Sequence, residues 1–412
     1  MRKSVIIFIL GFTACSAPHI DMEELKEAAQ KGDVLAQYCL GASYYEGQNI
    51  DKDIKKGREW LEKAAGEESA EAQNYLGNCY YEGEGVQQSY EKAVEWYEKA
   101  ALQGNAQAQN RLGECYYKGK GVQQSYEKAV EWLKKAAKQG DEYAQKNLAD
   151  CYYEGEGVQQ SYEKAMEWYE KAALQGNAQA QNILGDCYYM GNGVQESYEK
   201  AVKWYEKAAL QGNEYAQKNL ADCYYEGIGV EINYEKAAEW YEKAALQGNE
   251  YAQKNLADCY YEGEGVQQSY EKAAEWYEKA ALQGNAQAQY KLGLCYYEGE
   301  GVQQSHKKAI EWFEKAAEQG NEYALHKLGG HYEKKGSVED FEKALEYYQK
   351  AAKLGYSLAQ LKMAEIYFIR GKTKRICEEG VFWLEKACKN GEQRACEHLE
   401  ERKRACEQLK EE

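Results

Sequence analysis

The chain has 412 residues, and its composition is uneven, with 38 glycines, 39 tyrosines and a single proline. Such a mixture is typical of many helices that are interrupted at regular intervals. The formal net charge is −17, and the acidic and basic residues are interleaved along the chain. Because there is no concentrated basic stripe to contact phosphates, a nucleic-acid partner is not expected.

The N-terminus has the pattern of a secretory signal. Positive charge at residues 1–3 and an apolar run over residues 5–12 lead to small residues and Cys15. The tetrapeptide FTAC that ends at Cys15 resembles a bacterial lipobox, in which the cysteine becomes the acylated first residue of a lipoprotein, although Phe12 stands where leucine is usual. Cleavage after Ala17, which gives an unmodified protein, is the alternative. We expect an exported protein, either a periplasmic or outer-membrane lipoprotein or a secreted one, with membrane contact only through the lipid at Cys15.

Tryptophan and cysteine recur with a period of 36 residues along most of the chain. The tryptophans are Trp60, Trp96, Trp132, Trp168, Trp204, Trp240, Trp276 and Trp312, and the cysteines are Cys79, Cys115, Cys151, Cys187, Cys223, Cys259 and Cys295. This self-similarity predicts one elongated repeat array. Its predicted parts are a signal peptide over 1–15, a linker and capping half-repeat over 16–31, ten repeats over 32–390 and a capping helix over 391–412.

The unit from Gly104 to Gln139 shows how each repeat is built. Apolar residues at 108, 112, 115 and 116 have the spacing of an amphipathic helix, and those at 129, 132, 133, 136 and 137 have the same spacing in a second helix. Gly119 and Gly121 interrupt the pattern where a positive φ ends a helix, and Ser125 is predicted to cap the second helix. The predicted fold class is all-α, a solenoid of 36-residue helix-turn-helix repeats. The ninth unit is one residue shorter, near Gly336.

The capping serines also stand three residues before a lysine, as in the S-x-x-K motif of serine β-lactamases and penicillin-binding proteins. Ser89-Tyr90-Glu91-Lys92 is one example, and the pattern recurs in most repeats. Its serine is replaced by aspartate or asparagine in two repeats, which are also residues that cap helices, and the companion S-D-N and K-T-G elements are absent. The sequence therefore favours capping over catalysis, and no catalytic residue is assigned.

At this point the repeat resembles a known family. The segments LGECYY at 112–117 and YEKA at 126–129, followed by Trp132 and the alanine pair at 136–137, resemble the Sel1-like repeat, a relative of the tetratricopeptide repeat. The resemblance extends over about nine tenths of the chain. It implies a right-handed α/α superhelix whose concave surface is lined mainly by the first helices of the repeats, and a role as adaptor or scaffold for protein complexes.

The C-terminal stretch is similar to the Helicobacter cysteine-rich family of secreted Sel1-like proteins. The residues that carry this similarity are the tripeptide KAC that ends at Cys388 and the tetrapeptide CEHL that begins at Cys396. In that family such a pair joins the second helix of one repeat to the first helix of the next, so the resemblance implies a disulfide between Cys388 and Cys396. Some members of the family are described as β-lactamases, which implies an alternative function.

The seven periodic cysteines are predicted to be buried free thiols. They lie on the apolar face of each first helix, and equivalent positions in adjacent repeats should be about 10 Å apart, beyond the reach of a disulfide. Pairing with non-periodic cysteines and a metal site are the alternatives. Cys39, Cys377 and Cys406 lie off the period and are expected to be mostly unpaired. His326 and His331 have no neighbour at a ligand spacing, so no metal site and no cofactor are predicted.

Near-identical repeats present the same groups many times, which suits an extended binding surface better than one asymmetric catalytic site. The polar positions of the first helix are predicted to contact protein or peptide ligands along the concave groove: Gln107, Asn110, Arg111 and Glu114. The second tyrosine of each pair is expected to pack between repeats with a tethered hydroxyl, and its presentation to partners in the groove is a hypothesis. These tyrosines are Tyr81, Tyr117, Tyr153, Tyr189, Tyr225, Tyr261 and Tyr297. The predicted function is an exported interaction scaffold; a β-lactam-hydrolysing or penicillin-binding protein and a peptidoglycan-binding envelope protein are the alternatives.

Overall fold

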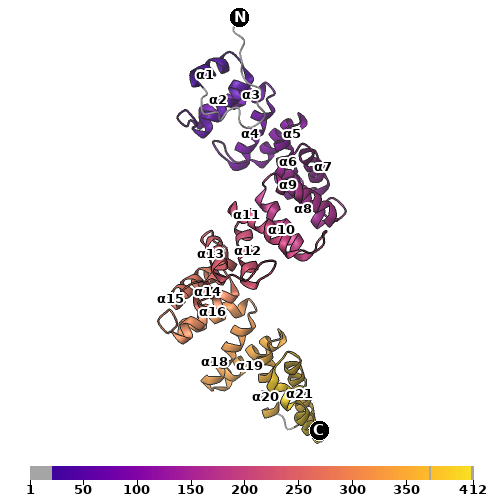
Figure 1. The fold of residues 1–412 in the computed structure, drawn as a ribbon, viewed down its shortest axis with the longest axis vertical. Coiled ribbons are helices and arrows are strands. Elements are labelled where there is room, and N and C mark those ends of the chain that lie inside the picture. Colours follow the sequence, from indigo (N-terminus) through magenta and orange to yellow (C-terminus); the bar gives the residue numbers. More distant parts are fainter. Residues whose placement is uncertain (1–20, 371–372, 410–412) are drawn as a thin grey trace. The chain divides into compact units, whose positions relative to one another are not determined.

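The structure, a computed structural model, describes residues 21–370 and 373–409. The predicted signal peptide and the predicted lipidation site, Cys15, lie outside these residues. Within the described ranges all regular elements are α-helices, 22 in number (Figure 1). The chain divides after Gln211 into two compact units. No helix of the described part is long and apolar enough to cross a membrane.

The first unit begins with a short helix and continues as helical hairpins. Its helices are α1 (Met22–Gln30), α2 (Val34–Glu46), α3 (Ile54–Gly66), α4 (Ala70–Glu82), α5 (Tyr90–Leu102), α6 (Ala106–Lys118), α7 (Tyr126–Lys138), α8 (Glu142–Glu154), α9 (Tyr162–Leu174), α10 (Ala178–Met190) and α11 (Tyr198–Leu210). The even-numbered helices open the repeats and are called A helices below. The odd-numbered helices from α3 onward close them and are called B helices.

The second unit has the same alternation to its end. Its helices are α12 (Glu214–Glu226), α13 (Tyr234–Leu246), α14 (Glu250–Glu262), α15 (Tyr270–Leu282), α16 (Ala286–Glu298), α17 (His306–Glu318), α18 (Glu322–Lys335), α19 (Val338–Lys353), α20 (Ser357–Arg370), α21 (Lys374–Lys389) and α22 (Gln393–Glu407). Between α18 and α19 the loop is reduced to Gly336 and Ser337. The 16-residue helix α19 is longer than the 13-residue B helix α7, so the shorter ninth repeat keeps its hairpin.

The hairpin of α6 and α7 shows why these residues form two helices. The Asn105 side chain accepts a hydrogen bond from the Ala108 amide at 2.9 Å and caps α6. Gly119, with φ of 67°, ends this helix in a left-handed conformation that glycine adopts at no steric cost. Ser125 Oγ accepts from the Lys128 amide at 3.3 Å and caps α7. The predicted helix limits and the predicted capping by serine are therefore confirmed.

The core of each hairpin consists of small and branched residues. Leu112 and Cys115 of α6 and Leu133 of α7 are buried, and each buried leucine contributes about 1.5–3 kcal/mol relative to an exposed one. Trp132, in contrast, is only partly buried and packs against the cluster that contains Leu112. The ammonium of Lys135 lies 3.8 Å from the centroid of its ring. The large indole therefore fills the space between hairpins incompletely, and leucine or tyrosine at the following position is the fully buried residue.

The second glycine of each turn marks the closest approach between repeats. Gly121 has a φ of +70°, and a Cβ atom at this position would lie 2.3 Å from the carbonyl oxygen of Tyr90, one repeat earlier. Gly157 lies in the same way against Tyr126. No side chain fits here, so these glycines let the turn of one repeat contact the start of the preceding B helix.

Candidate functional site

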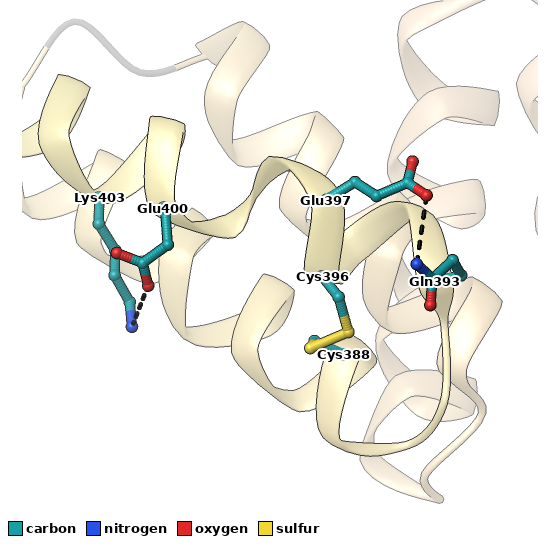
Figure 2. Close-up of a disulfide and its surroundings, with 6 residues drawn as sticks. All are labelled: Cys388, Gln393, Cys396, Glu397, Glu400 and Lys403. Carbon is teal, nitrogen blue, oxygen red and sulfur yellow. Dashed lines mark hydrogen bonds and ion pairs between the residues drawn. A yellow bond between two sulfur atoms is a disulfide. The ribbon is translucent and has the colours of Figure 1, made fainter.

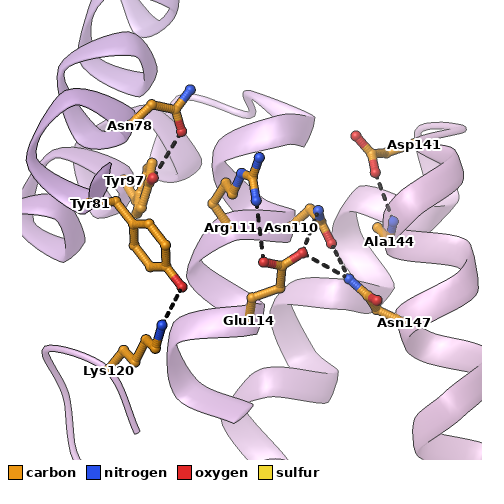
Figure 3. A network of polar contacts seen from close by, with 10 residues as sticks. All are labelled: Asn78, Tyr81, Tyr97, Asn110, Arg111, Glu114, Lys120, Asp141, Ala144 and Asn147. Atoms are coloured by element: carbon orange, nitrogen blue, oxygen red, sulfur yellow. Dashed lines mark hydrogen bonds and ion pairs between the residues drawn. The ribbon is translucent and has the colours of Figure 1, made fainter. Parts of the chain in front are cut away.

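The polar residues that the sequence predicts as partner contacts lie together on the A helices (Figure 3). Asn147 of α8 donates to Asn110 Oδ1 at 3.0 Å and to Glu114 Oε1 at 3.1 Å, and both acceptors belong to α6. Arg111 donates to the other carboxylate oxygen of Glu114 at 3.4 Å. Gln107 accepts a hydrogen bond from Asn74 of α4 at 3.3 Å. These side chains join neighbouring repeats, and Asn110 is buried, so their contact with a partner stays a prediction.

The predicted tyrosine positions are tethered through their hydroxyl groups. Tyr117 and Tyr225 donate to carboxylates of the next repeat, Glu156 and Glu264. Tyr261 donates to Glu300 at 2.5 Å. Two further tyrosines accept instead: Tyr153 from Asn192 at 3.0 Å and Tyr81 from Lys120 at 3.1 Å.

The rings of the same column also pack locally. The ring of Tyr117 lies 5.2 Å from that of Tyr126, and the ring of Tyr189 lies 5.2 Å from that of Tyr198. Inter-repeat packing with a tethered hydroxyl is thus present in this column, and any additional role in binding a partner remains a hypothesis.

A second set of amides links most A helices to the last turn of the preceding B helix and to the C-cap residue of the following one. Gln109 donates to the carbonyl oxygen of Ala101 at 3.0 Å, and its own Oε1 accepts from Gln139 at 2.8 Å. The pattern recurs in the second unit, where Gln253 donates to the carbonyl oxygen of Ala245 and accepts from Gln283. Buried amides are costly unless paired, so this chain of bonds satisfies them and fixes the spacing of the hairpins.

The seven periodic cysteines are buried free thiols, as predicted. Burial raises the pKa of the Cys115 thiol to about 11 and that of Cys151 to about 12. Thiols of this kind are protonated at neutral pH and unsuited to nucleophilic or metal-binding chemistry. Among the described residues, no group of three or more His, Cys, Asp and Glu side chains is arranged to hold a metal ion.

The expectation that the non-periodic cysteines are mostly unpaired is wrong. Cys377, near the start of α21, is joined to Cys406, near the end of α22, by a disulfide with a Cα–Cα distance of 5.6 Å. Cys39 is likewise not free. The two helices α21 and α22 form a hairpin, so the start of one lies beside the end of the other and the two cysteines meet.

The structure also contains the disulfide between Cys388 and Cys396, with a Cα–Cα distance of 4.7 Å (Figure 2). These cysteines occupy the positions that hold Ala101 and Gln109 in an earlier repeat, where the glutamine side chain bonds the alanine carbonyl. A covalent bond thus stands in the C-terminal hairpin where a hydrogen bond stands in interior repeats.

The serines of the S-x-x-K pattern cap the N-termini of the B helices with their hydroxyl groups. Ser89 Oγ accepts from the Lys92 amide at 3.3 Å and donates to Glu91 at 3.1 Å. The Lys92 ammonium lies over the ring of Tyr80, 5.4 Å from its centroid, rather than beside the serine. Asn233 caps α13 in the same way. The arrangement is that of a helix cap, and the lysine ammonium of the motif is directed to a tyrosine ring instead of the serine hydroxyl.

The structure shows a further surface that the sequence analysis did not single out. The last residue of several B helices is a leucine with 70% to 77% of its side chain exposed. This row, called the leucine edge below, consists of Leu102, Leu174 and Leu210 in the first unit and Leu246 and Leu282 in the second. Exposed tyrosines such as Tyr143 and Tyr251 lie five residues after the B-helix ends, across the loop between repeats. The signal in the sequence is an apolar residue that recurs directly after the buried alanine pair and outside the apolar stripe of its helix.

Comparisons with known proteins agree with this architecture. The Sel1 repeat family matches ten segments, which cover residues 34–67 and then, without a gap, 70–392. No match was found among curated proteins. Among solved structures, a protective antigen of uropathogenic Escherichia coli strains, described as displaying an SLR fold, is 38% identical over 96% of this chain and 85% of its own, with a TM-score of 0.82.

Two further solved structures are similar over smaller parts of the chain. A Sel1 repeat protein from Oxalobacter formigenes is 34% identical over 78% of this chain and 92% of its own, with a TM-score of 0.56. Cysteine-rich protein B of Helicobacter pylori is 29% identical over 32% of this chain and 96% of its own, with a TM-score of 0.27.

Proposed function

This chain belongs to the Sel1 repeat family, and we propose that it acts as a non-enzymatic scaffold that binds other proteins along its repeats. The solenoid fold of this family is typical of protein–protein interaction scaffolds. In such folds each repeat contacts its neighbours, and the remaining surface is an extended platform.

The observation that carries the proposal is the leucine edge. A single exposed leucine on a protein surface has no special meaning, but in each unit two of them stand at the same position of successive repeats, Leu174 and Leu210 in the first and Leu246 and Leu282 in the second, and form an apolar strip there. Leu246 and Leu282 each expose about 70% of their side chain to solvent. Covering such a strip with a partner removes apolar surface from water and stabilises the complex.

The A helices support the same function through their rigidity. Their polar side chains are bonded to neighbouring repeats, as in the contacts of Asn147 with Asn110 and Glu114. A surface whose side chains are already fixed loses little conformational entropy when a partner binds.

We further propose that the protein is exported and carries out this binding in the bacterial envelope or at a host surface. The support is the N-terminal sequence, with Cys15 as the lipid attachment point or Ala17 as the last residue of the signal. The S-x-x-K serines serve as helix caps, so they give no support to β-lactam hydrolysis as the function.

The test is affinity capture with the purified full chain and with two matched double variants. In the first variant Leu246→Ser and Leu282→Ser remove the apolar groups of two repeats. In the second, Glu242→Ser and Glu278→Ser alter exposed residues of the same helices outside the leucine edge. We expect saturable binding of the captured protein to be lost with the leucine variant and kept with the glutamate variant. Equal binding by both variants, or turnover of a chromogenic β-lactam by the parent chain, would refute the proposal.

A further inference from the structure

A pocket of about 370 Å³ lies among α20, α21 and α22 at the C-terminal end of the second unit. One wall is formed by apolar residues of α20, namely Leu361, Phe368 and Ile369, and Leu384 of α21 adds a further apolar group. The exposed fraction of Ile369 is 86%, so this wall is open to solvent. We call this feature the C-terminal pocket.

The opposite wall carries the basic groups. Arg394, His398 and Arg402 of α22 line the pocket at positions i, i+4 and i+8, which places them on one face of the helix. Within residues 373–409 and 21–370, no carboxylate forms an ion pair with either arginine. The guanidinium of Arg402 lies 4.8 Å from the centroid of the Phe368 ring on the other wall. The single acidic residue of the lining is Glu365, and its carboxylate forms an ion pair with the Lys362 ammonium at 3.8 Å.

Both disulfides hold the basic wall in place. Cys396 lies half a turn from Arg394 and joins α22 to the end of α21, as Figure 2 shows for the bond to Cys388. Cys406 lies one turn after Arg402 and joins the other end of α22 to Cys377. The helix that carries the arginines is therefore fixed to α21 at both ends.

The pocket lies beside two A helices, α20 and α22, that no polar side-chain link joins within the described residues. In the interior of the second unit, Asn255 of α14 donates to Asp222 of α12 at 3.2 Å. Between α20 and α22 no side-chain hydrogen bond joins the parts that the structure describes. Leu361 occupies the position of Asn110, and Phe368 occupies that of Tyr117, so an apolar surface replaces the polar one on the same face.

We propose that the C-terminal pocket binds an extended acidic peptide in which acidic and apolar residues alternate. This rests on the proposed function and names the chemistry of one partner. Along α22 the basic groups are about 6 Å apart, from four residues at about 1.5 Å each. In an extended strand, side chains on the same side are about 6.6 Å apart and successive side chains point to opposite sides. Such a peptide directs its carboxylates to Arg394, His398 and Arg402 and its apolar groups to Phe368 and Ile369.

Charge supports an acidic ligand and argues against a single carboxylate. Arg394 and Arg402 line the pocket without a carboxylate partner among the described residues, so an acidic peptide supplies their counter-charge. The wall extends over about 12 Å, which is longer than one carboxylate can contact. Two or three regularly spaced acidic residues fit this length.

The test uses fluorescence anisotropy with the full chain and two fluorescein-labelled hexapeptides of the same composition. One alternates aspartate and leucine, and the other has three aspartates followed by three leucines. We expect saturable binding of the alternating peptide, about tenfold weaker binding of the block peptide, and weaker binding at high salt. The double variant Arg394→Ala and Arg402→Ala should lower affinity at least about tenfold. The variant Arg404→Ala alters the same helix outside the pocket lining and should bind as the parent does.

A second variant protects the test against misfolding. Ile369→Asn changes a residue of the apolar wall whose side chain is 86% exposed, so it should weaken binding while leaving the helical content unchanged. Equal affinity for the two peptides, or equal loss with Arg404→Ala, would overturn the pocket proposal. If the peptides fail to bind while capture through the leucine edge persists, the scaffold function stands and only the pocket proposal falls.

Discussion

The hydroxyl of Tyr169 in α9 donates a hydrogen bond of 2.7 Å to Oδ1 of Asp150 in α8. The second oxygen of this carboxylate accepts from Lys146 at 2.8 Å. The bond recurs between Tyr241 and Asp222. Where the B helix carries a phenylalanine in place of tyrosine, at Phe313, the A helix carries a leucine, Leu294, in place of the aspartate. In these three repeats the two positions match as a polar pair or as an apolar pair, whereas Glu114 of α6 stands opposite Leu133 of α7.

Removing the hydroxyl alone should destabilise this hairpin. Tyr169→Phe leaves the part-buried Asp150 without one of its donors, and we expect a loss of about 1–2 kcal/mol. The double variant Asp150→Leu with Tyr169→Phe reproduces the natural combination of Leu294 and Phe313 and should regain part of that loss. Hydrogen exchange of the α8 and α9 amides measures both effects locally. Losses that simply add in the double variant would show that the two side chains are independent.

Alanine substitutions at two glycines of the second unit distinguish the cost of backbone strain from the cost of a steric clash. Gly248 has a φ of +104° and no atom within 4 Å of an added Cβ, so Gly248→Ala should cost about 1–2 kcal/mol from backbone strain alone. Gly265 has a φ of +71°, and its Cβ would lie 2.0 Å from the Tyr234 carbonyl oxygen. Gly265→Ala should therefore cost about 3 kcal/mol or more. Urea denaturation compares the two variants, and equal midpoints would contradict the close approach between repeats.

Stability should fall at alkaline pH because of the buried thiols. Burial raises the pKa of Cys187, Cys223 and Cys259 from 9.0 to about 12. In the unfolded chain these thiols ionise near their ordinary pKa, whereas the folded chain keeps them protonated, so unfolding releases protons above about pH 9. The stability contributed by the neutral thiols is present below pH 9 and is lost as pH rises toward 12.

Unfolding midpoints measured from pH 7 to 10 check this dependence. The triple variant with alanine at positions 187, 223 and 259 should show a smaller decline between pH 9 and 10 than the parent chain. In the native chain at pH 8, the periodic thiols should also react with Ellman's reagent far more slowly than after unfolding. Rapid labelling of the folded chain would show that these cysteines are accessible.

The two C-terminal disulfides should differ in their contributions. The Cys377–Cys406 bond links residues 29 positions apart, and the Cys388–Cys396 bond links residues eight positions apart. The chain-entropy relation gives about 3.6 kcal/mol for the longer loop and about 2.6 kcal/mol for the shorter one. Two double variants, each with serine in place of both cysteines of one disulfide, test which bond contributes more. The stability of α22 in each variant is measured by hydrogen exchange. A larger effect from the shorter loop would point to native-state packing rather than loop entropy.

Much of the fold follows from local patterns in the sequence. Helix limits could be predicted because caps such as Asn105 and Ser125 and turn glycines such as Gly119 act within a few residues of themselves. The burial of Cys115 follows from the same helical spacing. Contacts between repeats could not be predicted from these local patterns. The acceptor of the Tyr117 hydroxyl, for example, is Glu156, which is 39 residues away.

The remaining features depend on how the last helices meet. The bond between Cys377 and Cys406 requires that α21 and α22 form a hairpin that brings the start of one to the end of the other, which spacing alone does not specify. The leucine edge does not follow from the buried apolar stripe of each helix, because Leu246 lies outside that stripe and is exposed. The C-terminal pocket combines three helices, and no single segment of sequence contains it.

The disulfide between Cys388 and Cys396 limits how the array can lengthen. Gln360 accepts a hydrogen bond from Asn390 at 2.9 Å, so α20 still offers an amide oxygen to the loop between α21 and α22. In α22 the equivalent position is Cys396, whose sulfur is bonded to Cys388 and has no amide oxygen to offer. A hairpin stacked after α22 would therefore lack the amide link that joins Asn390 to Gln360 in the preceding repeat.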